Sequence, residues 1–207
     1  VFDPVRARPA TYDEMLGSGE PARLAEIERA IDALSNLIGE TTAHEIGHSL
    51  GFPHSGDDNQ HTSALDLMSN SAAPREVDPA RRDGPDTLAV NRLAAGWLPL
   101  DAVTVVSRPG GDYRLVPSNA ADGPRLLVLP LDDLRFLTVE LIDNTGVNDH
   151  LLAPGVVVHL IDQRPEACRS LGSTEQCHNE LRRQTPLSSA APNTDLLAIG
   201  EEWTGEG

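Results

Sequence analysis

The stretch TAHEIGHSLGFPH, residues 42–54, decides how this chain is interpreted. On a helix, residues four apart share a face, so His44 and His48 can offer two imidazole nitrogens to one metal ion. Gly51 can adopt a positive φ that ends the helix and turns the chain back, which brings His54 toward the same ion. Three protein ligands leave one coordination position open, which is typical of a catalytic zinc site rather than a structural one.

Glu45 lies next to the first of these histidines. A carboxylate beside a metal-activated water can accept its proton, so we predict that Glu45 is a general base. Thr42 and Glu45 also satisfy the S/T-x-x-E capping box, in which the glutamate only closes the start of a helix. Glu45 is therefore either a general base or a helix-capping residue.

The spacing of the motif is specific. A bare H-E-x-x-H arises by chance in somewhat fewer than one in a hundred chains of this length, and adding the glycine and the third histidine lowers this to roughly one in 10⁵. The third ligand has alternatives, because a different turn would present another side chain in place of His54. These alternatives are Asp57, Asp58 and His61, with Glu76 completing a two-histidine site as a further one.

Helical periodicity surrounds this motif on its N-terminal side. Apolar residues recur at helical spacing from Glu20 to about Leu37, which predicts an amphipathic helix ended by Gly39. A second helix is predicted over 42–50, stopped by Gly51. Residues 54–90 are polar and lack sustained periodicity, so they are predicted to form long surface loops.

Short apolar runs bounded by turn sequences follow Trp97. Regular spacing of such runs favours an antiparallel sandwich or barrel over a parallel sheet. The predicted strands are Val103–Val106, Tyr113–Val116, Leu126–Leu131, Phe136–Ile142, Val156–Ile161 and Leu196–Ile199.

The zinc motif resembles the extended signature of the metzincin metalloproteases, H-E-x-x-H-x-x-G-x-x-H. Those enzymes carry a methionine-containing turn beneath the metal, and Met68 in LDLMSN, residues 65–70, is the candidate here. Some metzincins place a tyrosine two positions after that methionine. Asn70 occupies this position, so no such tyrosine is expected.

Residues 91–98 and the runs around Glu140 and 155–162 are similar to the region behind the zinc site in gametolysin-like and immune-inhibitor-A-like secreted peptidases. The resemblance implies an α+β fold, in which a helical metzincin-like zinc domain, 1–97, precedes an antiparallel β-sandwich-like companion domain, 98–207. Metzincins place a substrate-binding sheet before the zinc helix, and only 43 residues precede His44. We therefore expect both domains to be incomplete, the first at its N-terminus and the second at its C-terminus.

Charge and cysteine content limit the partners. The chain of 207 residues carries 16 basic and 32 acidic residues, and its net charge of -16 would repel a nucleic-acid backbone. No apolar run approaches the roughly 18 residues of a membrane-spanning helix. Cys168 and Cys177, with eight residues between them, are spaced for a small disulfide loop, which favours a secreted protein; two unrelated thiols are the alternative.

The remaining polar residues carry less information. Loop carboxylates at Asp132–Asp133 and 143–149 could hold calcium, but they lack EF-hand spacing. His150, His159 and His178 are interpreted as strand or surface residues without a role, and the oligomeric state cannot be predicted. The sequence predicts a secreted zinc endopeptidase acting on a protein or peptide substrate, with His44, His48 and His54 as ligands and Glu45 as base. The alternative is a secreted β-sandwich binding module with a non-catalytic remnant of the zinc site.

Overall fold

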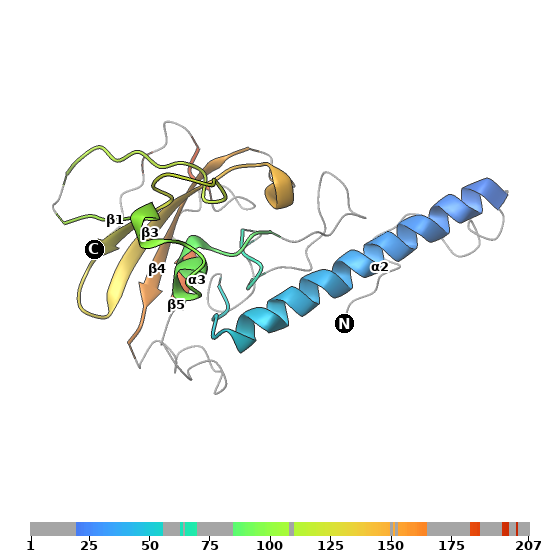
Figure 1. Ribbon diagram of the computed structural model, residues 1–207, viewed down its shortest axis with the longest axis horizontal. Helices are drawn as coiled ribbons and strands as arrows, with labels where there is room; N and C mark the ends of the chain where they lie inside the picture. The colour runs from blue at the N-terminus through green and yellow to red at the C-terminus, as the bar shows by residue number, and fades with distance from the viewer. Residues whose placement is uncertain are drawn as a thin grey trace.

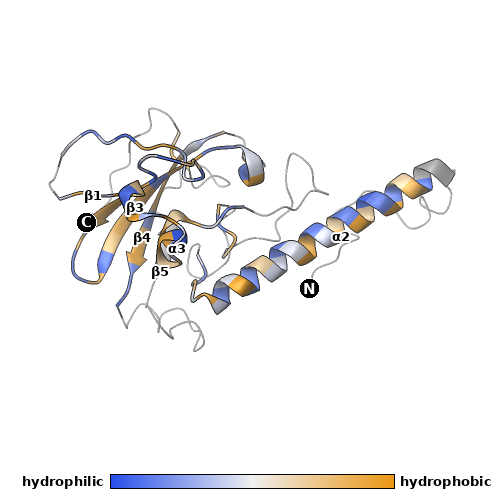
Figure 2. Ribbon diagram, viewed as in Figure 1, coloured by the Kyte–Doolittle hydropathy of each residue, from blue (hydrophilic) through white to orange (hydrophobic). Residues whose placement is uncertain are grey.

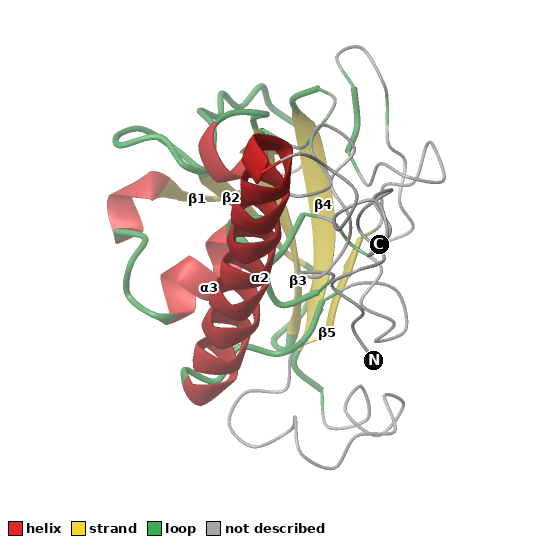
Figure 3. Cartoon of the chain, turned by 90° about the vertical axis from the view of Figure 1, so that its right-hand side faces the viewer, coloured by secondary structure: helices red, strands yellow, loops and turns green. Residues whose placement is uncertain are grey.

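A computed structural model describes residues 20–55, 63, 65–69, 85–107, 110–149, 151, 153–164, 183–186, 196–198 and 202. A long helix, α2 (Glu20–Ser49), extends away from a body built around a β-sheet (Figure 1). His44 and His48 lie in the C-terminal turns of this helix, at the end that meets the body, and His54 follows the helix. In Figure 3, α2 lies in front of the sheet.

The sheet has five strands in the order β1-β2-β3-β4-β5. The first pair, β1 and β2, is parallel, and the other three pairs are antiparallel. The predicted fold class is therefore correct in mixing helix and strand, but the described strands form one mixed sheet and not a sandwich. The strands are β1 (Val103–Val105), β2 (Leu126–Pro130), β3 (Arg135–Ile142), β4 (Gly155–Asp162) and β5 (Arg183–Pro186).

Four of the six predicted strands are confirmed to within one residue at each end: β1, β2, β3 and β4. The prediction of a strand at Tyr113–Val116 is wrong. Both edges of β2 are already occupied, by β1 and β3, and the chain between β1 and β2 serves as their crossover connection. Of the last predicted strand only an isolated bridge between Val156 and Leu197 is described, and β5 was not predicted.

The prediction that a helix ends at Gly39 is also wrong, because α2 runs through it without a break. Glycine in a helix interior costs about 1 kcal/mol relative to alanine, which the flanking helix formers tolerate. Thr42 therefore lies inside the helix, so the capping-box interpretation of Glu45 is excluded. Although α2 has 30 residues, no helix in the described part of the chain is apolar enough to cross a bilayer.

The apolar stripe of α2 is helical as predicted but remains uncovered. Figure 2 shows apolar and polar residues alternating along the helix, which extends away from the sheet. Five apolar side chains spaced three and four residues apart are 37–57% exposed. They are Leu24, Ile27, Ile31, Leu34 and Ile38.

The core lies between the sheet and the segment that leads from the metal site to β1. This segment contains the short helices α3 (Ala89–Ala94) and η2 (Leu100–Ala102), while η3 (Gly146–Asn148) follows β3. Residues from both sides of position 97 pack together in each apolar cluster, and the boundary predicted there stays a prediction. The three clusters are Leu65, Ile142, Val157 and Leu196; Ala89, Leu98, Ala102 and Leu126; and Leu88, Val90 and Ile161.

Two ionisable side chains are buried on neighbouring strands, Glu140 of β3 and His159 of β4. Burial raises the pKa of Glu140 to about 7, partly offset by the Arg92 guanidinium 3.9 Å away and by the Ala89 backbone N–H, which donates to the carboxylate. Within the part of the chain that the structure describes, neither ring nitrogen of His159 has a hydrogen-bond partner. Burial alone lowers the pKa of His159 to about 4.

These two pKa values give opposite pH dependences of stability. The folded-state pKa of Glu140 is raised from 4.5, so its contribution to stability is present below pH 4.5 and is lost as the pH rises to about 7. The folded-state pKa of His159 is lowered from 6.5, so its contribution is present above pH 6.5 and is lost as the pH falls to about 4.

We expect the Glu140→Gln variant to gain stability relative to the wild type as the pH rises from 4.5 to 7, by a change on the order of 3 kcal/mol. Urea unfolding of the metal-free proteins across this pH range measures it. A His159→Gln variant should show the opposite slope: it should gain stability relative to the wild type as the pH falls from 6.5 to about 4. A difference between Glu140→Gln and wild type that did not change with pH would contradict the assignment.

Candidate metal centre

The three predicted ligands meet at one point. The Nε2 atoms of His44 and His54 are 3.2 Å apart, those of His48 and His44 3.1 Å, and those of His48 and His54 2.9 Å. In the described part of the chain, no other group of three or more His, Cys, Asp or Glu residues is close enough to hold a metal ion. The sequence therefore identified correctly which histidines converge.

Backbone carbonyls fix the protonation of two of these rings. The Nδ1 atom of His44 lies 2.8 Å from the Leu67 carbonyl oxygen, and that of His48 lies 3.1 Å from the Phe52 carbonyl oxygen. Because a carbonyl oxygen only accepts hydrogen bonds, each Nδ1 carries the hydrogen and each Nε2 presents a lone pair. This is the orientation that metal-binding histidines have in proteins.

Three converging Nε2 atoms cannot satisfy one another. One N–H from His54 can serve only one neighbour, which leaves lone pairs facing each other about 3 Å apart. A cation at the centre removes this repulsion. Tetrahedral zinc with bonds of about 2.0–2.1 Å separates its ligand nitrogens by about 3.3–3.4 Å, so the observed spacing needs to open by only a few tenths of an ångström.

The chain reversal that delivers His54 is a helix cap built on glycine. Gly51 has a φ of 83°, in the left-handed region that only glycine adopts without strain. The Gly51 N–H donates to the His48 carbonyl, and the Phe52 N–H donates to the Gly47 carbonyl. This pair of bonds is the Schellman motif. The turn at Gly51 and the return of His54 are therefore confirmed.

Met68 packs against the helix between the two helical histidines. Its side chain is fully buried, and a Cβ placed on Gly47 would lie 2.3 Å from its Sδ atom. Position 47 therefore accepts no side chain while Met68 keeps its place. Met68 was predicted from the sequence, whereas Gly47 was not, although a glycine inside a helix is a recognised sign of close packing.

Glu45 is exposed on α2, one position after His44. Its backbone carbonyl accepts a hydrogen bond from the Ser49 hydroxyl, which is an ordinary helical contact. An exposed carboxylate next to a ligand can be reached by water and by substrate. This arrangement is compatible with a general base, and the role stays a prediction.

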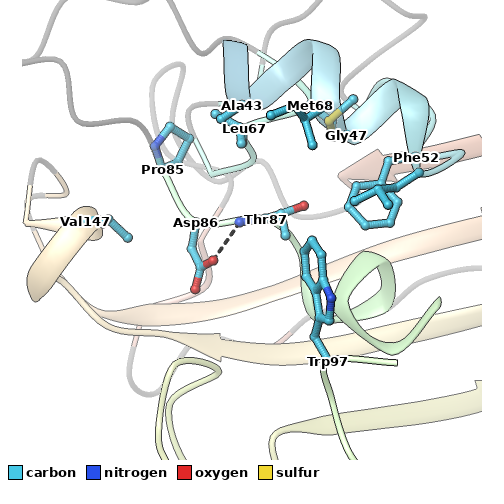
Figure 4. Close-up of a pocket in the computed structure, with 12 residues that line it drawn as sticks. Ala43, Gly47, Phe52, Leu67, Met68, Pro85, Asp86, Thr87, Trp97 and Val147 are labelled. Atoms are coloured by element: carbon cyan, nitrogen blue, oxygen red, sulfur yellow. Dashed lines mark hydrogen bonds between the residues drawn. The ribbon is translucent and has the colours of Figure 1, made fainter. Parts of the chain in front are cut away.

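An apolar cavity of about 330 Å³ is lined by the C-terminal turns of α2 and by the segments around Met68, Asp86 and Trp97 (Figure 4). Gly47, Phe52, Leu67 and Met68 line it, and the Leu67 and Phe52 carbonyls also orient His44 and His48. Trp97 forms another wall, with its ring centroid 5.8 Å from that of Phe52. None of the three histidines lines the cavity, and neither does Glu45. The cavity is therefore separate from the three converging histidine side chains.

Several residues weighed from the sequence lie outside the described residues: Asp57, Asp58, His61, Asn70, Glu76, His150, Cys168, Cys177 and His178. The disulfide is among the predictions that fall there. Among the calcium candidates, Asp132 accepts hydrogen bonds from Leu134 N, Arg135 N and the Arg135 guanidinium, which hold the pKa of its carboxyl below the usual value. Its oxygens are thus occupied by protein donors, which does not favour calcium there.

Comparisons of this chain with protein-family models, with curated proteins and with solved structures found no match.

Proposed function

We propose that this chain is a zinc-dependent endopeptidase of the metzincin type. The observation that carries the proposal is the convergence of three imidazole Nε2 atoms, two of them oriented by carbonyl oxygens, within 3.2 Å of one another. Imidazole is a preferred ligand of zinc, and a three-histidine set leaves a coordination position open. His44, His48 and His54 would hold the ion.

Bound zinc supplies Lewis acidity, which polarises a scissile carbonyl and makes water acidic enough to react near neutral pH. The residues of the chain provide the rest. Glu45 accepts the proton of the attacking water and passes it to the leaving amine nitrogen. His44 and His48 hold their Nε2 lone pairs toward the ion throughout, because Leu67 and Phe52 keep the hydrogen on Nδ1.

The substrate in this proposal is a protein or peptide, and the setting is extracellular. The extracellular setting is proposed from the predicted Cys168–Cys177 disulfide and from the resemblance to secreted peptidases. The net charge of -16 favours neutral or basic substrates over acidic ones.

We expect the chain to cleave a generic unfolded protein, to lose this activity when a chelator removes zinc, and to regain it when stoichiometric zinc is returned. Product formation on a gel and the zinc content of the same samples are measured together. Cleavage that survives removal of the zinc would contradict the proposal. A folded sample that binds zinc and cleaves nothing would favour the non-catalytic binding module.

A further inference from the structure

Asp66 has a completely buried carboxylate that accepts hydrogen bonds on both sides. The Ser55 hydroxyl donates to its Oδ2 at 2.5 Å, and the Thr87 hydroxyl donates to its Oδ1 at 3.1 Å. The backbone N–H groups of Leu88 and Met68 also donate to this carboxylate. Asp66 thus joins three segments that are separate in sequence.

Two of these segments carry the metal centre. Ser55 follows His54 directly, and its N–H donates to the Met68 carbonyl at 3.3 Å. Leu67, directly after Asp66, supplies the carbonyl that orients His44. The carboxylate of Asp66 therefore fixes the backbone beside one ligand relative to the carbonyl that holds another.

The third segment leads on to α3, and it also meets the turn of Leu67 through its backbone, since the Leu67 N–H donates to the Asp86 carbonyl at 3.2 Å. Thr87 and Leu88 precede α3, where Thr87 also accepts a hydrogen bond from the Asn91 side chain. A bond from Thr87 to Asp66 stabilises this segment but touches neither a ligand nor its carbonyl partner. The two hydroxyl donors to one carboxylate therefore differ in what they position.

We propose that Asp66 is a positioning residue of the metal centre, which holds His54 in place through the Ser55 hydroxyl against the turn that orients His44. The inference rests on the proposed function, in that the centre it serves binds zinc. It adds a residue that lies outside the metzincin signature, and it assigns the effect to one of the two hydroxyl groups bonded to the carboxylate.

The test compares Ser55→Ala with Thr87→Val. Each variant removes one hydroxyl donor from the same carboxylate. Asp66→Ala is a poorer test, because it would leave every donor to this carboxylate without its acceptor. We expect Ser55→Ala to weaken zinc binding by about tenfold or more, as loss of a partner that orients a ligand does. The zinc affinity of Thr87→Val should stay within about threefold of the wild-type value, because the Thr87 hydroxyl orients no ligand. Competition with a chromophoric chelator measures the zinc affinity of each variant.

The absorption spectrum of the cobalt-substituted proteins gives a second readout that a loss of stability alone does not move. Its visible bands should change in Ser55→Ala and match the wild type in Thr87→Val, while thermal unfolding shows that both variants are folded. Equal zinc affinities and equal spectra in the two variants, with zinc bound by the wild type, would overturn the role of Asp66 and leave the proposed function intact. A wild type that binds no zinc would overturn both.

Discussion

Replacing Glu45 with glutamine is expected to lower kcat for peptide hydrolysis by about 10²–10⁴-fold, the usual contribution of a general base. The amide has nearly the same shape as the carboxylate but cannot accept the proton of the attacking water. Because Glu45 is not among the three converging side chains, the variant keeps the whole ligand set, and its zinc content should stay close to that of the wild type. Steady-state kinetics and metal content are measured on the same preparation.

Glu28→Gln is the matched control, since Glu28 is also an exposed glutamate of α2 and lies in its N-terminal half. It removes the same charge from the same helix and should leave kcat unchanged. If Glu45→Gln kept more than a tenth of the wild-type kcat, Glu45 would not be the base. If both variants lost activity equally, the loss would reflect the charge of the helix and not proton transfer.

Replacing Gly47 with alanine is expected to destabilise the protein by about 1–3 kcal/mol, the usual effect of overpacking, because the fully buried Met68 side chain must shift to make room for the methyl group. The new Cβ would lie 2.3 Å from the Met68 Sδ atom and 3.1 Å from its Cε. The sign is the informative part, because alanine in a helix interior is otherwise favoured over glycine by about 1 kcal/mol. Urea unfolding of the metal-free protein measures the change.

Gly39→Ala in the same helix is the control. A Cβ placed there meets nothing within 4 Å, so helix propensity should dominate and stabilise the protein by up to about 1 kcal/mol. In a double-mutant cycle, Gly47→Ala should cost less stability in the Met68→Ala background than in the wild type, and this difference measures the coupling between the two positions. Two alanine variants that stabilise the protein equally would contradict the packing described for Met68.

The ligand set was predictable because it depends on local geometry. A spacing of four on a helix and a glycine that reverses the chain bring His44, His48 and His54 together over eleven residues. The helix itself was predicted as two helices, because glycine often ends a helix, whereas α2 continues through Gly39. Among the described residues, a Cβ placed on Gly39 would meet nothing within 4 Å, and residues on both sides of it continue the helical pattern.

The environment of the ligands was not predictable, because it depends on contacts between segments distant in sequence. Leu67 reaches His44 across 23 positions, and Asp66 is as ordinary in sequence as any other aspartate in a polar stretch. The parallel pairing of β1 with β2 was missed for a similar reason. It requires a long crossover, and no local pattern distinguishes that crossover from a hairpin with an additional strand.

The distribution of these contacts along the chain also bears on how the molecule assembles. The metal ligands close loops of four to ten residues, and loop-closure entropy is smallest for such short loops. The bond from Ala89 to Glu140, which ties the neighbouring segment to the sheet, closes a loop of 51 residues. Long-range closures of this kind raise the contact order and slow folding. The three metal ligands thus come together with a smaller loss of chain entropy than the neighbouring segment does when it attaches to the sheet.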